Sequence, residues 1–171
     1  MPVREQGVTI TARHDARLGL LFAVSIAVLG AALLGVVYGW FDHENVFYEV
    51  NTLATLGLGY AVGHLCARGA AAGSVESPGA RTALGIVAGT TAVYGAWVAW
   101  LHATLASAGY TGWVLDPFEI AEYMRQIASV GAWTIEHATP TGGMLWATWT
   151  AEAAAIIAIA AVVTRAGANR L

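Results

Sequence analysis

Charge and cysteine are both scarce in this sequence. Only 11% of the 171 residues are charged, and the eight basic residues are all arginine. So few basic groups, spread along the chain, argue against a nucleic acid as a partner. Cys66 is the single cysteine, so the chain can form neither an internal disulfide nor a C-x-x-C thiol pair. This excludes the membrane thiol oxidases as models for its function.

Catalytic motifs are missing as well. The sequence contains no nucleophile elbow, no H-E-x-x-H motif of zinc proteases and no phosphate-binding loop. Its glycine-rich run from Gly57 to Gly63 lies within an apolar stretch and lacks the spacing of a dinucleotide fingerprint. We therefore predict no catalytic residue, and the sequence itself requires no cofactor.

Long apolar runs are what the sequence has in abundance. Hydrophobic residues make up 57% of the chain, and its mean hydropathy is +0.61. Several runs come close to the ~20 residues that a helix needs to cross a bilayer. They are Leu18–Trp40, Val50–Ala67, Thr82–Leu105 and Met144–Thr164. We predict an all-α integral membrane fold in which residues 1–171 form a single domain, a bundle of four transmembrane helices in the lipid bilayer.

The arginines are distributed unequally between the two ends of these runs. Most arginines lie before the first run, between the second and third runs, or after the fourth run. They are Arg4, Arg13, Arg17, Arg68, Arg81, Arg165 and Arg170. The other two connections hold only Arg125. Because basic segments stay on the cytoplasmic side, we expect a cytoplasmic (inner) membrane protein with both termini in the cytoplasm.

The second external connection contains a segment with strong helix signals, residues 117–130. Asp116 is suited to the N-cap, Pro117 to the first helical position, and Glu119 to a capping box. Apolar residues then recur at helical spacing on one face, at Ile120, Tyr123, Met124, Ile127 and Val130. The pattern predicts an amphipathic helix that lies on the outer membrane surface. The alternative is a docking face for a partner protein.

Small residues recur every four positions within the apolar runs. The rows include Gly35, Gly39, Gly59, Gly63 and Gly95. Such rows allow helix backbones to approach closely, which is the main source of helix association in lipid. We interpret them as contacts inside one bundle. With three such rows, one could also serve self-association or a partner's helix.

Glu152 is the most informative single residue. It lies about eight positions into the fourth apolar run, ~12 Å along a helix that rises 1.5 Å per residue. A carboxyl group at that depth is costly unless it is protonated, paired or in contact with water. Glu152 could be a proton or cation site, or a protonated glutamate that links helices structurally. Trp149, three positions earlier, shares its face.

A second group of polar residues is expected near the outer surface. It comprises Asp42, His43, Glu44, Glu49, Asn51, His102, Glu136 and His137. Glu49, Asn51 and His102 are candidates for contact with a ligand or ion. His43, His102 and His137 are weak candidates for a metal site, because imidazole and carboxylate bind transition metals. No pair has a characteristic ligand spacing, so surface charge is the alternative interpretation.

Aromatic residues also concentrate toward this outer side. Examples are Tyr38, Trp97, Trp100, Trp146 and Trp149. An interfacial aromatic belt accounts for such a pattern. A pocket for a hydrophobic ligand, such as a quinone, a lipid or a pigment, is the alternative.

Three classes of function follow from these observations. The first is a non-catalytic membrane subunit that packs into a larger complex with other membrane proteins, or into a homo-oligomer. The second is a small oligomeric transporter or channel with Glu152 as its proton or cation site. The third is a metal or redox enzyme that uses the outer His/Asp/Glu group. The sequence favours the first.

Overall fold

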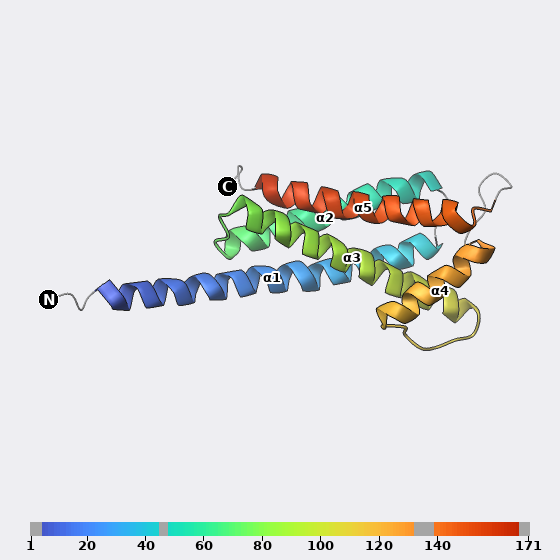
Figure 1. The fold of residues 1–171 in the computed structure, drawn as a ribbon, viewed down its shortest axis with the longest axis horizontal. Helices are drawn as coiled ribbons and strands as arrows, with labels where there is room; N and C mark the ends of the chain where they lie inside the picture. Colours follow the sequence, from blue (N-terminus) through green and yellow to red (C-terminus); the bar gives the residue numbers. More distant parts are fainter. Residues whose placement is uncertain (1–4, 45–47, 132–138, 168–171) are drawn as a thin grey trace.

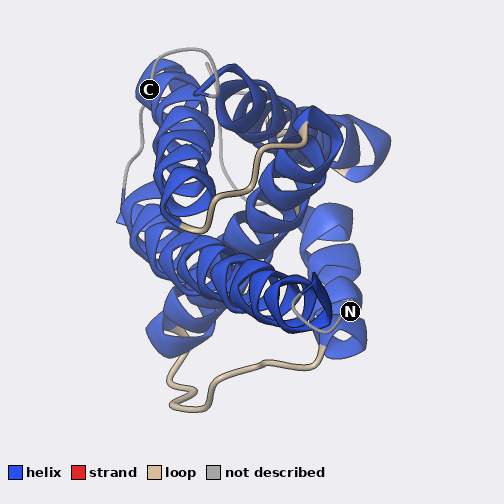
Figure 2. Cartoon of the chain, turned by 90° about the vertical axis from the view of Figure 1, so that its left-hand side faces the viewer, coloured by secondary structure: helices blue, strands red, loops and turns tan. Residues whose placement is uncertain are grey.

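The computed structural model describes residues 5–44, 48–131 and 139–167. Side chains are described for residues 18–44, 50–131 and 139–167. This part of the chain folds into helices joined by short connections, without a strand (Figure 2). The helices are α1 (Glu5–Glu44), α2 (Tyr48–Ala72), α3 (Pro78–Ser107), α4 (Pro117–Val130) and α5 (Gly142–Ala166).

The four long helices lie side by side, and successive ones run in opposite directions (Figure 1). Helices α1 and α5 each pack against both α2 and α3, whereas α1 and α5 contact each other little. The order around the bundle is therefore α1, α2, α5, α3. Helix α4 lies across one end, which we call the α4 end, and the N-terminal part of α1 projects beyond the opposite end.

Three of these helices are long and apolar enough to cross a membrane, within the residues that the structure describes. They are Leu18–Glu44 of α1, Pro78–Ser107 and Gly142–Ala166. Helix α2 has a similar length, but polar residues such as Asn51, Thr52 and His64 make it less apolar. The all-helical fold with apolar candidate spans is thus confirmed for three of the four predicted segments.

The helices extend beyond the apolar runs on either side of the α2–α3 connection. Helix α2 continues to Ala72 and α3 begins at Pro78, so only five residues connect them. Alanine favours a helix, which explains why α2 continues through its alanine-rich end. The turn is held by Arg81, whose Nε donates a hydrogen bond of 2.6 Å to the carbonyl oxygen of Val75, and by Ser77, which caps α3.

Helix α4 has the N-cap that the sequence predicts. The Asp116 side chain accepts hydrogen bonds from the backbone N–H groups of Phe118 and Glu119. Its apolar face does not remain open, because Ile120, Met124 and Ala128 are almost completely buried, in a cluster with residues of α3 and α5. The chain itself therefore covers the centre of this face. Phe118 in the first turn is 84% exposed and lies outside this buried face.

Glycine brings neighbouring helices close together, including α1 with α3 and α2 with α5. A Cβ atom at Gly35, Gly39 or Gly95 would lie 2.1–2.8 Å from a backbone carbonyl oxygen across the α1–α3 contact. At Gly59 and Gly63 it would lie 3.0 and 2.7 Å from side-chain carbons of α5. All five predicted packing glycines therefore face another helix of the same chain, where any larger residue would force the helices apart.

Substitution of Gly35 by alanine tests this packing. The added methyl carbon would lie 2.1 Å from the carbonyl oxygen of Ala92, so we expect a loss of about 1–3 kcal/mol, the range for overpacked cores. Gly57→Ala is the matched control, because its methyl group meets no atom within 4 Å. Unfolding by SDS in mixed micelles measures both variants. Equal stability of the two would contradict the close α1–α3 contact.

Candidate functional site

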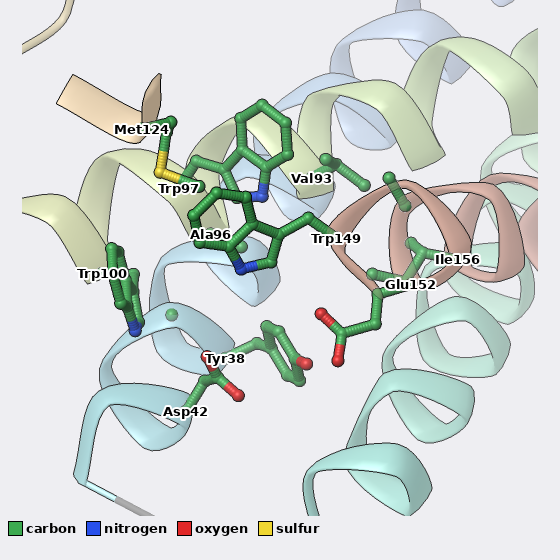
Figure 3. Close-up of a pocket in the computed structure, with 12 residues that line it drawn as sticks. Tyr38, Asp42, Val93, Ala96, Trp97, Trp100, Met124, Trp149, Glu152 and Ile156 are labelled. Atoms are coloured by element: carbon green, nitrogen blue, oxygen red, sulfur yellow. The ribbon is translucent and has the colours of Figure 1, made fainter. Parts of the chain in front are cut away.

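The structure brings two carboxyl groups and a phenol together near the α4 end of the bundle. Asp42 and Tyr38 come from α1, and Glu152 comes from α5. Figure 3 shows their polar ends directed toward a common space. These residues line a cavity of about 30 Å³, which has room for one or two water molecules or a small ion. We call this space the inner cavity.

The position of the inner cavity follows from the packing order. Because α1 and α5 contact each other little, side chains rather than backbones fill the space between them. Large indoles of α3 and α5 line much of it, namely Trp97, Trp100 and Trp149, with Met124 of α4 beside them (Figure 3). Trp149 makes edge contacts with Trp100 and Trp146, with ring centroids 6.4 and 5.5 Å apart. These contacts hold Trp149 in the wall of the cavity.

Tyr38 is held in place by α2. Its hydroxyl lies 2.8 Å from Oγ1 of Thr55. The Thr55 hydroxyl in turn donates a hydrogen bond of 2.9 Å to the carbonyl oxygen of Asn51. Since Thr55 has one proton to donate, the Tyr38 hydroxyl is the donor in their contact. The lone pairs of the Tyr38 oxygen can then accept from, or coordinate, a group in the inner cavity.

No positive side chain of the described residues neutralises Glu152 or Asp42. The only ion pair in this part of the chain joins Arg125 to Glu122 on the surface of α4, at 2.7 Å. Hydrogen bonds from Arg125 lower the pKa of Glu122 to about 2. In the inner cavity, by contrast, the charge that acts on Glu152 is that of another carboxyl group, Asp42. Two like charges in a partly buried space favour the uptake of one proton or cation between them.

Glu152 also borders a second, larger space. A groove of about 410 Å³ lies between α2 and α5. Thr52, Thr55 and Leu56 line it from α2, and residues between Met144 and Ala155 line it from α5. We call this space the lateral groove. Glu152 is the only residue besides alanine, threonine, leucine and methionine in its wall. It is thus the only residue that lines both the inner cavity and the lateral groove.

His102 lies apart from these spaces. Its ring stacks on Trp113, with centroids 3.9 Å apart and planes 3° apart, and its Nδ1 lies 3.0 Å from the carbonyl oxygen of Gly112. Tyr94 also donates a hydrogen bond to this connection, at the carbonyl oxygen of Leu115. His102 therefore fixes the connection between α3 and α4 and does not face Glu152.

The predicted metal candidates do not converge within the described residues. The Nδ1 atom of His43 lies 3.4 Å from Oγ1 of Thr104, and no group of three His, Cys, Asp or Glu residues in the described part of the chain is placed to hold a metal ion. His137 and the side chain of Glu49 lie outside the described residues. Asn51 contributes to the site through its backbone carbonyl, which accepts from Thr55.

The sequence identified Glu152 and Trp149, but it did not single out their partners on α1. The sequence groups Asp42 with the outer His/Asp/Glu residues, and Tyr38 with the aromatic residues of a belt or of a pocket for a hydrophobic ligand. A signal was present, since residues four apart in a helix share a face, and Tyr38 and Asp42 have this spacing. That they face Glu152 follows only from the order of the helices around the bundle.

No protein-family model, curated protein or solved structure matches this chain.

The contact between Tyr38 and Thr55 can be measured by a double-mutant cycle. We expect Tyr38→Phe and Thr55→Ala each to destabilise the protein. Their coupling should be about 0.5–1.5 kcal/mol, the range for hydrogen bonds between membrane helices. SDS unfolding of the wild type, both single variants and the double variant gives the coupling free energy. Strict additivity of the two substitutions would contradict the hydrogen bond between α1 and α2.

Proposed function

We propose that this protein is a small membrane transporter in which Glu152 binds a proton or a cation. The observation that carries the proposal is that Glu152 lines both the inner cavity and the lateral groove. A site open on two sides can exchange its bound ion with either. An acid buried purely for structure would instead be enclosed by hydrogen-bond donors.

In this proposal the four long helices all cross an inner membrane, including the less apolar α2, with both termini in the cytoplasm. Support comes from the described arginines: Arg68, Arg81 and Arg165 lie toward the end of the bundle opposite α4, and Arg125 is on α4. Cytoplasmic segments are enriched in basic residues. The inner cavity and the lateral groove would then lie in the outer half of the membrane.

The residues have distinct roles in the proposed cycle. Glu152 holds the proton or cation, and Asp42 adds a second negative charge that favours binding. Tyr38, fixed by Thr55, presents an oxygen toward the same space. Trp149 and its neighbouring indoles shield the bound ion on the α3 side. Exchange of a proton for a cation leaves the total charge of the cavity unchanged, which keeps the electrostatic cost of both states low.

Four helices provide few surfaces for a conduction path, so we propose that the working unit is a homo-oligomer. The second candidate is a subunit of a larger membrane complex. It is favoured by apolar residues exposed on and beside the α3–α4 connection, including Trp113, Leu115 and Phe118, which could contact a partner protein. The glycine rows do not favour it, because they are occupied by contacts within the chain.

The test is ion movement in proteoliposomes. We expect wild-type vesicles loaded with a pH-sensitive dye and a monovalent cation, such as sodium, potassium or tetramethylammonium, to acidify when diluted into buffer that lacks this cation, because each cation that leaves is exchanged for a proton. Glu152→Gln should slow this at least tenfold, because the amide cannot exchange a proton. Glu119→Gln is the matched control, since Glu119 is exposed on α4 and should leave the rate unchanged.

Equal rates for the wild type and Glu152→Gln would remove Glu152 from the mechanism and overturn the proposal.

Native mass spectrometry of the same preparations, in mild detergent, distinguishes the transporter from the subunit of a larger complex. A homo-oligomer fits the transporter. A defined assembly with other membrane proteins, together with the absence of ion movement by the purified chain, would favour the subunit.

A further inference from the structure

The lateral groove is too large for the ion that the inner cavity can hold. Its volume is about 410 Å³, against about 30 Å³ for the inner cavity. The larger value lies within the usual range of pockets for small organic molecules, about 300–1,000 Å³. A bare inorganic ion would leave most of the lateral groove empty, whereas an organic molecule could fill it.

The wall of the lateral groove selects for an apolar body. On α5 it consists largely of alanines at every fourth position, Ala147, Ala151 and Ala155, which leave a depression along the helix. Leu56 and Met144 add larger apolar surfaces, and both are partly exposed, at 44% and 66%. The lateral groove therefore opens on the side of the bundle, where the proposed bilayer would be. A lipophilic molecule could enter directly from the membrane.

The charge of the lateral groove selects for a cation. Glu152 is the only ionisable residue in its wall, and Asp42 acts on it from the inner cavity. No cationic side chain of the described part of the chain pairs with either acid. A ligand with one positive charge would supply the missing counter-charge, and its apolar groups would lie against the alanines. An anionic ligand would be repelled by both carboxylates.

We propose that the lateral groove binds a lipophilic organic monocation, with its charge against Glu152 and its apolar groups between α2 and α5. This rests on the proposed function and names the class of substrate that the transporter would exchange for a proton. Binding of the cation and of a proton at Glu152 exclude each other, because both use the same carboxylate.

The probe for this proposal is radiolabelled tetraphenylphosphonium, measured by equilibrium dialysis against the purified protein in detergent, with empty micelles as the blank. We expect saturable binding that is at least tenfold weaker in Glu152→Gln and partly retained in Glu152→Asp. Neutral triphenylphosphine oxide should not compete at concentrations where unlabelled tetraphenylphosphonium does. Competition by the neutral compound, or equal binding by Glu152→Gln, would overturn the proposal.

A second pair of variants tests the location without altering any charge. Ala151→Phe places a ring in the lateral groove and should weaken binding of the cation at least tenfold. Ala154→Phe is the matched control, because Ala154 is exposed on α5 but does not line the lateral groove. It should bind like the wild type. Equal binding by Ala151→Phe would place the cation elsewhere and overturn the proposal.

Failure of this proposal and failure of the proposed function give different results. Absence of saturable tetraphenylphosphonium binding, with proton movement that still depends on Glu152, would overturn the substrate class and leave the transporter. Saturable binding that depends on Glu152 and Ala151, without any ion movement by the same preparation, would support the lateral groove as a cation site and overturn transport.

Discussion

Backbone contact at glycine holds neighbouring long helices close together, α1 with α3 and α5 with both α2 and α3. Gly35 and Gly39 lie so near the carbonyl groups of Ala92 and Ala96 that no side chain fits between them. Apolar burial drives little association between helices in lipid, so such close contacts supply much of the packing energy through dispersion. Helices α1 and α5 lie diagonally opposite in this arrangement and contact each other little.

The candidate site occupies the space that this separation leaves. Toward the opposite end the bundle core is built from alanines such as Ala23, Ala27 and Ala160, all fully buried, and the helices approach closely. Toward the α4 end, the indoles of Trp97, Trp100 and Trp149 take the place of alanine. These rings leave a cavity of about 30 Å³ between them, and the polar ends of Asp42, Tyr38 and Glu152 meet there.

Sequence reasoning reached the local features and missed those that depend on the relative positions of helices. The cap at Asp116 and three apolar spans are properties of short segments, and the structure confirms them. The approach of Asp42 to Glu152 joins residues 110 positions apart. It depends on the order of helices around the bundle, which hydropathy does not encode. His102 shows the same limit, since its stacking on Trp113 requires the path of an irregular connection.

Helix α2 departs most from the apolar pattern, and the site gives a physical reason. Its polar residues include Asn51, Thr52 and Thr55, within its first two turns. Thr55 fixes the Tyr38 hydroxyl, the carbonyl of Asn51 orients Thr55, and Thr52 lines the lateral groove. Polar residues inside a membrane are costly and tend to mark pathways for ions or ligands. Part of the low hydropathy that weakens α2 as a candidate span therefore lies where α2 borders Glu152, and these polar residues support the proposed binding site.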